Sequence, residues 1–342
     1  GRPGVVVLFP YPLLPADNGG SARTLVLLRA LRGAGYFVWL VGVGWRPEHR
    51  RELAVCADAV VVLPDLPGDP ETRIRESGLN TLRARYHPGF DEVVPALVEF
   101  SSPRVVLASF AFSAYGLNRV PEGLLRVVDT IDIQHRRADV ALEHGGDLES
   151  RRCSRDDELE ALGDADLLIS IQPEERKVFE SMFPDKLHIV CGHAVEECRA
   201  LVPDCHSRKV LFIGNRYDPN TLGIRAFIRD VWPTVLGHVP DATLDVVGTV
   251  CRDLSDDAPR VRLHGFVPDV EPFYERAAVV VNPVAYGSGQ KIKTIEALAF
   301  GKCLVMTPAA RLGVPKDAPC VEREMHSMAD AVIDMLRNPE KR

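Results

Sequence analysis

The chain has 342 residues, of which 46% are hydrophobic and 26% are charged, and its formal net charge is −7 at pH 7. This length exceeds one compact core and indicates two domains, while the composition is ordinary for a globular protein. The acidic balance argues against a large nucleic-acid-binding surface, and apolar runs of roughly five to eight residues are far too short to span a membrane.

The first half of the chain alternates between strand and helix patterns. We predict strands over Val5–Phe9, Phe37–Val43, Ala59–Leu63, Val105–Ser109, Arg126–Ile131 and Leu167–Ile171, and a helix over Ser21–Gly35. Residues 65–90 are rich in Pro, Gly and charge, so we expect a loop with one short helix there, and the charged residues 135–162 are expected to be helical. Pro173 then starts another helix, because proline is favoured in the first helical turn.

The same alternation begins again in the second half. We predict strands over 210–214, 244–248, 261–263, 279–283 and 303–307, and helices over 220–238, 270–277 and 290–300. Such a pattern predicts an α/β fold with two Rossmann-like domains, whose parallel sheets face a cleft. We place an N-terminal domain at residues 1–200 and a C-terminal domain at 208–342, joined by the polar stretch Glu196–Lys209. Ligands of open parallel sheets bind beyond the carboxyl ends of the strands, where all the motifs below lie.

The most informative motif is GSGQKIKTIEALAFG, which begins at Gly287 and lies between two apolar runs. A glycine turn at the start of a helix offers free backbone N–H groups and the positive end of the helix dipole to phosphate or sugar oxygens. The chain has only eight lysines, and two of them, Lys291 and Lys293, fall here, where they can neutralise phosphate charge. The Glu296 carboxylate can accept hydrogen bonds from both hydroxyls of a ribose. The plain alternative is a helix with solvated charges.

Three further polar segments follow predicted strands. Gly19 and Gly20 precede a helix, and backbone can approach a phosphate or sugar closely there because no side chain intervenes. Arg216 lies in a turn after the first strand of the second domain and offers a planar fork to a diphosphate. Asp132 and His135 follow the strand that ends at about residue 131, and His135 is the histidine we expect to act in the site. An ordinary loop, a surface arginine and an exposed histidine are the alternatives.

Eight cysteines are scattered along the chain. The group Cys191, His193, Cys198, Cys205 and His206 invites a zinc interpretation, but it lacks the paired CxxC or HxxxH spacing of metal sites. We therefore expect no structural zinc here, and reduced thiols in a cytoplasmic protein. The first residues run directly into a strand, so we expect no signal peptide. A peripheral membrane contact through an amphipathic surface stays open.

Taken together, these segments resemble family 4 of the glycosyltransferases, the retaining enzymes of the GT-B fold. The resemblance spans almost the whole chain and is carried by FPYPLLPADNGGSARTLVLL, LFIGNRYDPNTLGIRAF, VRLHGFVPD and VVVNPVAYGSGQKIKTIEALAFGKCLVMT. The last of these is the most specific. Residues 45–105 match no recognised pattern, and acceptor sites of the family lie in that half.

The resemblance implies the transfer of a sugar, with retention of configuration, from a nucleotide-diphosphate donor to an acceptor hydroxyl. We expect this transfer to need no metal, because Arg216, Lys291 and Lys293 supply the positive charge and no Asp-x-Asp motif lies in a suitable loop. The donor would bind mainly to the C-terminal domain, and the acceptor, a small molecule or glycan, to the N-terminal one; no cofactor beyond the donor is implied. Backbone amides of Gly289–Ile292 would meet the sugar hydroxyls, and His135, with Asp132 nearby, would lie close to the reacting carbon. The implied donor-binding residues are Gly19, Gly20, Arg216, Ser288, Gly289, Gln290, Lys291, Lys293 and Glu296.

Two features depart from the family's pattern. Many members carry two glutamates eight positions apart, whereas position 288 is serine here, which leaves a non-catalytic sugar-nucleotide binder as an alternative. Members usually continue with a helix that crosses back to the N-terminal domain, and this sequence ends at Arg342, where that segment is expected to begin. A nucleotide-sugar epimerase of the same architecture is a second alternative, although its acid and base carboxylates are not apparent. A dehydrogenase is disfavoured because no GxGxxG follows the first strand.

Overall fold

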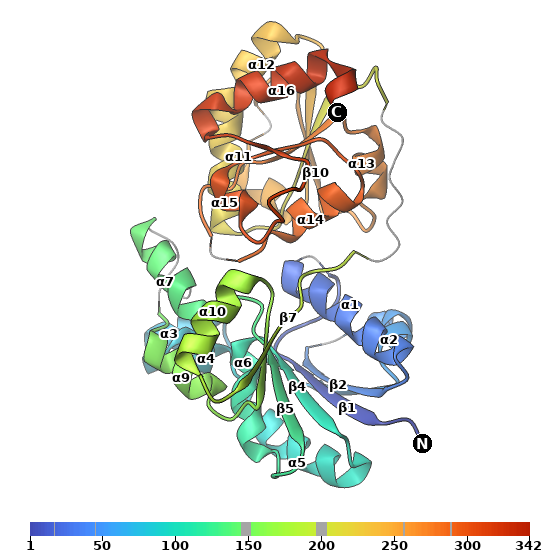
Figure 1. Ribbon diagram of the computed structural model, residues 1–342, viewed down its shortest axis with the longest axis vertical. Helices are drawn as coiled ribbons and strands as arrows, with labels where there is room; N and C mark the ends of the chain where they lie inside the picture. Colours follow the sequence, from blue (N-terminus) through green and yellow to red (C-terminus); the bar gives the residue numbers. More distant parts are fainter. Residues whose placement is uncertain (17, 45, 145–151, 196–203, 256, 288) are drawn as a thin grey trace. The chain divides into compact units, whose positions relative to one another are not determined.

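The computed structural model describes residues 1–342 except 17, 45, 145–151, 196–203, 256 and 288 (Figure 1). These residues form two compact units, one made of Gly20–Gly192 with the N-terminal strand and the other mainly of His193–Arg342. Each unit is built on a parallel sheet with helices packed against it. The predicted fold class, α/β with two Rossmann-like domains, is therefore confirmed. Part of the predicted joint, residues 196–203, lies outside the described residues.

The sheet of the N-terminal unit has the strand order β3-β2-β1-β4-β5-β6-β7, and every neighbouring pair is parallel. Its strands are β1 Gly4–Phe9, β2 Phe37–Val43, β3 Ala59–Leu63, β4 Val105–Ser109, β5 Leu125–Asp129, β6 Leu167–Ser170 and β7 Leu187–Val190. The chain builds outward from β1 through β3 and then returns to the other side of β1 at β4. The switch point, where ligands of such sheets bind, therefore lies between β1 and β4.

The helices of the N-terminal unit cover this sheet. They are α1 Gly19–Gly33, α2 Arg50–Cys56, α3 Pro70–Ser77, α4 Thr81–Arg85, α5 Phe90–Ser101, α6 Ala111–Ala114, α7 Gln134–Glu143, α9 Arg155–Leu162 and α10 Pro173–Met182. The prediction of one short helix within residues 65–90 is wrong, because α3 and α4 both form there. Asp69 caps α3 by accepting from the Thr72 N–H at 2.8 Å, and Gly78 ends it in the left-handed region. α10 begins at Pro173, as predicted.

The sheet of the C-terminal unit has the order β10-β9-β8-β11-β12-β13, again with parallel pairs. Its strands are β8 Lys209–Ile213, β9 Thr243–Val247, β10 Val261–Gly265, β11 Val279–Asn282, β12 Leu304–Met306 and β13 Val321–Glu322. Its helices are α11 Asp218–Ala226, α12 Trp232–His238, α13 Glu271–Arg276, α14 Ile292–Ala299, α15 Pro308–Arg311 and α16 Met328–Arg337. The switch point of this sheet lies between β8 and β11.

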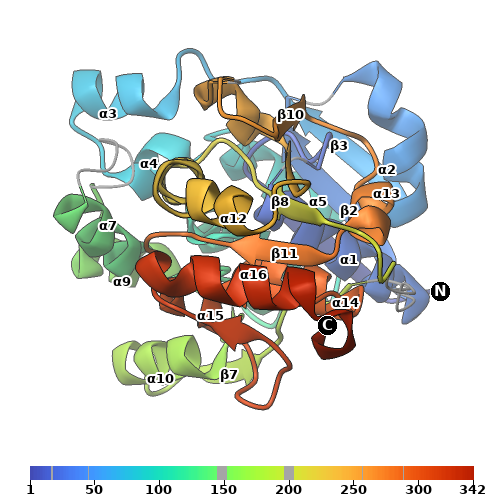
Figure 2. The ribbon, with the colours of Figure 1, turned by 90° about the horizontal axis from the view of Figure 1, so that it is seen from above.

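Successive side chains along the strands of the C-terminal unit point to opposite faces of the sheet, so each face has its own hydrophobic core. Val210 and Phe212 of β8 pack with residues of α11, α12 and α16, whereas Leu211 packs with residues of α13, α14 and α15. α12 and α16 lie side by side over the first face (Figures 1 and 2). A π-helical segment, Phe227–Val231, joins α11 to α12 within the predicted helix. Among the described residues, no helix is long and apolar enough to cross a bilayer.

Candidate functional site

Loops that follow β8, β9 and β11 come together at the carboxyl edge of the C-terminal sheet. Gly248, after β9, has a φ of +108°, and a Cβ placed on it would overlap the backbone of Gly214, after β8. These two loops therefore pack backbone against backbone, which only glycine permits. A Cβ placed on Gly214 would lie 3.4 Å from the Nζ of Lys293, which follows β11. The three loops thus form one site at the switch point.

The glycine-rich loop leads directly into α14. Lys291 is the residue before the helix, and its ammonium donates a hydrogen bond to the carbonyl oxygen of Gly289. Gly287 has a φ of +139°, and a Cβ there would lie 3.0 Å from the Lys291 Nζ. The loop therefore folds around the lysine side chain and keeps its charge beside the first N–H groups of the helix, where anions are stabilised. Ser288 lies outside the described residues.

Lys293 lies in the first turn of α14, and its ammonium contacts the end of β8 and the first turn of α11. Its Nζ donates to the Oδ1 of Asn220 and lies 4.7 Å from the centroid of the Phe212 ring. Asn220 is buried and donates in turn to the Oδ1 of Asn215 at 2.7 Å. Burial, and then the nearby charge of Lys291, lower the pKa of Lys293 to about 7. An arriving anion would therefore meet a lysine that is poised to take up a proton.

Glu296 lies one turn further along α14. The Tyr274 hydroxyl donates to its Oε2 over 3.4 Å, and burial raises the pKa of Glu296 to about 6. The Tyr274 ring stacks on Phe300 at 4.5 Å between centroids, which holds the hydroxyl in place. At neutral pH the carboxylate is ionised and has lone pairs to offer to a donor such as a sugar hydroxyl.

Two predicted donor-binding side chains already have partners within the C-terminal unit. The Arg216 side chain is 63% exposed, and its Nε donates to the carboxylate of Asp253 at 2.9 and 3.0 Å. The amide of Gln290 accepts from the His193 N–H at 3.1 Å and donates to the carbonyl oxygen of Gly313 at 2.6 Å. Arg216 can therefore reach a ligand by leaving an exposed pair, whereas the Gln290 side chain holds the glycine-rich loop to its neighbours.

Gly20 lies in the first turn of α1, the helix that Gly19 begins, and packs within the N-terminal unit. A Cβ on Gly20 would overlap the ring of Phe110 and come within 2.8 Å of the Tyr11 hydroxyl. Packing against these two aromatic rings is therefore a sufficient reason for glycine at this position. The predicted close approach of a ligand to Gly19 and Gly20 stays a prediction.

Asp132 and His135 lie where the chain passes from β5 into α7. The Oδ1 of Asp132 accepts from the Ile133 N–H at 2.9 Å. The imidazole Nδ1 of His135 lies 2.5 Å from the Oε2 of Glu158, a fully buried carboxylate on α9. Sequence reasoning missed Glu158, because 23 residues separate it from the histidine. Its nearest signal is the capping box formed by Ser154 and Asp157 at the start of α9.

A second group of buried charges in the N-terminal unit was also not predicted. Arg23 of α1 forms a bidentate ion pair with Asp129, the last residue of β5, and both N···O distances are 2.8 Å. Glu175 on α10 is buried and accepts from the Gln172 amide at 3.1 Å. Burial, and then the charge of Asp132, raise the pKa of Glu175 to about 9. The predicted Asp132 is thus close enough to Glu175 for its negative charge to favour the protonated, neutral form of that carboxyl group.

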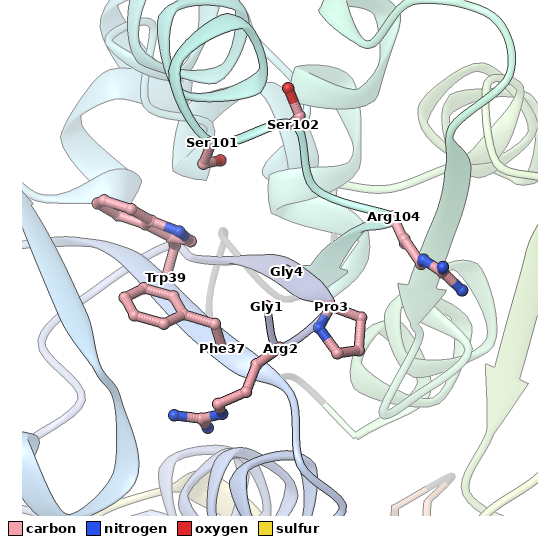
Figure 3. Close-up of a pocket in the computed structure, with 9 residues that line it drawn as sticks. All are labelled: Gly1, Arg2, Pro3, Gly4, Phe37, Trp39, Ser101, Ser102 and Arg104. Carbon is pink, nitrogen blue, oxygen red and sulfur yellow. The ribbon is translucent and has the colours of Figure 1, made fainter.

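A pocket of about 570 Å³ lies at the opposite edge of the N-terminal sheet (Figure 3). It is lined by Gly1, Arg2, Pro3, Gly4, Phe37, Trp39, Ser101, Ser102 and Arg104. Gly4 and Phe37 begin β1 and β2, so the pocket lies at the amino ends of these strands. No predicted site residue lines it. Within the described part of the chain, no group of three or more His, Cys, Asp or Glu side chains is placed to hold a metal ion.

Residues 207–338 match the family model described as glycosyl transferases group 1. This range falls in the C-terminal unit and contains the glycine-rich loop and α14. The chain is also 29% identical over 116 residues to an uncharacterized 44.6 kDa protein in the cps region of Klebsiella pneumoniae. That alignment covers 30% of this chain and only 30% of the curated protein.

Solved structures resemble the chain over nearly its full length. Sucrose-phosphate synthase from Thermosynechococcus elongatus has a TM-score of 0.72 at 16% identity, covering 99% of this chain and 91% of that one. S. aureus TarM, in complex with Fondaparinux, alpha-GlcNAc-glycerol and UDP, has a TM-score of 0.71 at 10% identity, covering 99% and 94%. Anabaena Alr3699/HepE, in complex with UDP and glucose, has a TM-score of 0.65 at 14% identity, covering 99% and 91%. At such identities the likeness shows the fold, two Rossmann-like units of the GT-B type.

Proposed function

We propose that this chain, whose family match and fold support a group 1 glycosyltransferase, is a metal-independent retaining enzyme that uses a nucleotide-sugar donor. The observation that carries the proposal is the site at the switch point of the C-terminal sheet. There Lys291, Lys293 and Glu296 lie on the glycine-rich loop and the first turns of α14, within the matched range. Cations beside free helix N–H groups suit a diphosphate, and the carboxylate suits the hydroxyls of a ribose.

The proposed transfer breaks the bond between the anomeric carbon of the sugar and the diphosphate oxygen. The acceptor hydroxyl forms a bond to that carbon from the same face, and its proton passes to the departing diphosphate. Negative charge on the diphosphate grows in the transition state, so Lys291, Lys293 and Arg216 would lower the barrier by stabilising it. These side chains supply the positive charge that a metal ion provides in other transferases, which supports metal independence. Backbone amides of Gly289–Ile292 would hold the sugar hydroxyls.

Binding and turnover measurements separate this proposal from its alternatives. A melting experiment with UDP, GDP, dTDP, ADP and NAD, without added metal, should show a higher Tm with a nucleoside diphosphate and none with NAD, because a ligand that binds only the folded state stabilises it. UDP is the first choice, since the TarM and HepE structures are complexes with it. Binding without transfer to any acceptor would indicate a sugar-nucleotide binder, and an epimerised donor an epimerase.

We expect the substitution Lys291→Ala to weaken nucleoside diphosphate binding by about tenfold or more, because a hydrogen bond to a charged group contributes roughly 1.5–3 kcal/mol. Isothermal titration calorimetry with the nucleotide identified above measures the effect. Lys316→Ala is the matched control, since Lys316 is an exposed lysine of the same unit. Equal affinities of the two variants would remove Lys291 from the site.

We expect His135→Ala to lower kcat by about 100-fold, the effect of losing one group that stabilises a transition state, while donor affinity stays the same. The control is His144→Ala, at the other end of α7. Initial rates over a range of donor concentrations measure kcat and KM separately. Wild-type turnover in His135→Ala would show that this histidine is not catalytic.

A further inference from the structure

Glu158 makes three contacts with the start of α7, and it uses both carboxylate oxygens. Its Oε1 accepts from the Gln134 N–H at 2.9 Å, and its Oε2 accepts from the His135 N–H at 3.2 Å. The same Oε2 lies 2.5 Å from the His135 Nδ1. The Glu158 side chain is fully buried, and that of His135 is 13% exposed. The Glu158 carboxylate therefore contacts both the backbone and the ring of His135, and it fixes the orientation of the ring.

The contacts define which of the two groups carries the proton. Two backbone N–H donors and the positive end of the α7 dipole stabilise the ionised form of a carboxylate. An ionised carboxylate accepts hydrogen bonds and has no proton to give. The short contact between Glu158 and the His135 Nδ1 must then be an Nδ1–H donating to Oε2. In the neutral imidazole the other nitrogen, Nε2, is left without a proton and acts as an acceptor.

We propose that Glu158 is a positioning residue that fixes His135 in the Nδ1–H tautomer, so that Nε2 offers a lone pair to a substrate hydroxyl. The inference deepens the proposed function and rests on it for the role of His135 in transfer. It specifies the chemistry of the group that His135 meets, because an unprotonated Nε2 accepts a hydrogen bond from a hydroxyl and repels a phosphate oxygen. In this arrangement the histidine suits a hydroxyl group, whereas phosphate oxygens suit cationic side chains.

The tautomer can be measured without any substrate. In the full-length protein labelled with 15N-histidine, two-dimensional NMR at about pH 8.5, roughly two units above the ordinary pKa of histidine, distinguishes a protonated Nδ1 from a protonated Nε2. His135→Ala assigns the signal. We expect Nδ1–H in the wild type and Nε2–H in Glu158→Gln, since the amide has one acceptor oxygen for the three N–H groups that contact Glu158, and the backbone N–H groups compete with the ring for it. Nε2–H in the wild type, or Nδ1–H in Glu158→Gln, would overturn the proposal.

Two further variants control for folding and for charge. Glu158→Asp keeps a carboxylate, so it should retain the Nδ1–H tautomer even if the shorter side chain loses a backbone contact, and it serves as the test should Glu158→Gln not fold. Loss of Nδ1–H in Glu158→Asp would then count against the proposal. Asp156→Asn removes one charge from an exposed position of α9 and should change neither tautomer nor turnover.

Kinetic measurements distinguish a failure of the positioning role of Glu158 from a failure of the proposed glycosyl transfer. Glu158→Gln should lower kcat by about 10- to 100-fold with an unchanged donor KM, as when the orienting partner of a metal-bound histidine is removed. A changed tautomer with wild-type kcat would overturn the positioning role. If the wild type itself transfers no sugar, the proposed function fails, while the NMR result still decides whether Glu158 sets the tautomer of His135.

Discussion

Replacing Arg23 with alanine is expected to lower the free energy of unfolding of the N-terminal unit by about 3–5 kcal/mol, since breaking a buried ion pair leaves one charge without its partner. The Arg23 side chain is 5% exposed, and that of Asp129 is fully buried. Arg23 also donates to the carbonyl oxygen of Cys191 at 2.7 Å. The substitution would therefore leave a buried carboxylate and a backbone oxygen without their donor, at the junction of α1, β5 and the residue that follows β7.

Chemical denaturation followed by far-UV circular dichroism measures this effect. Arg29→Ala is the matched control, because Arg29 is an exposed arginine of the same helix and its loss should change stability by less than about 0.5 kcal/mol. Arg23→Lys keeps the charge but not the bidentate fork, so its stability should fall between those of wild type and Arg23→Ala. The double variant Arg23→Met/Asp129→Leu should be more stable than Arg23→Ala, because it leaves no unpaired charge. Equal stability of Arg23→Ala and Arg29→Ala would contradict the expected role of the pair.

The sequence predicts the strands with continuous apolar runs well, because turns bound these runs. Phe37–Val43, Ala59–Leu63 and Val105–Ser109 form strands with the predicted bounds. β7 was not predicted, since this edge strand of four residues, Leu187–Val190, is largely exposed and lacks a buried pattern. Strand prediction thus follows continuous apolar runs, which β3 keeps at the other edge of the sheet although only its Leu63 is buried.

In the candidate site, the sequence predicts residues that are close together along the chain but not contacts between residues that are far apart. Lys291, Lys293 and Glu296 lie within six residues of one another, so one motif was enough to bring them together. The partners that orient the N-terminal residues come from far along the chain: Arg23 and Asp129 are 106 residues apart, and His135 and Glu158 are 23 apart. No spacing rule connects such pairs, because only the packing of helices against the sheet brings them into contact.

Donor affinity is expected to fall as the pH rises through about 7, the pKa of Lys293 in the free protein. A diphosphate beside Lys293 favours the charged ammonium, so the pKa of the lysine rises when the donor binds, and binding takes up a proton. Below about pH 7 the lysine is already charged and affinity should be constant. Above it, each pH unit should weaken binding by up to about tenfold, the cost of protonating the lysine first, until the pH reaches the pKa of the bound state.

The probe for this prediction is a nucleotide sugar with the base identified in the melting experiment, because its diphosphate carries no group that titrates near neutral pH. Calorimetry between about pH 6.5 and 9, in two buffers of different ionisation enthalpy, measures affinity and proton uptake together. The lower limit stays above the pKa of Glu296, which is raised to about 6, so that this carboxylate is mostly ionised throughout. Lys291, whose charge contributes to the lowered pKa of Lys293, is left intact in every variant.

Substitutions at Lys293 distinguish its titration from that of other groups. Lys293→Arg carries a guanidinium that stays charged at every pH of the experiment, so its affinity should be independent of pH. Lys293→Met should bind weakly and also without pH dependence. If wild type and Lys293→Arg lose affinity in parallel as the pH rises, another group is responsible. The prediction is confirmed if only the wild type loses affinity and it takes up a proton on binding. Lys293, which is desolvated beside Phe212 and Asn220, then becomes protonated and positively charged when the diphosphate binds.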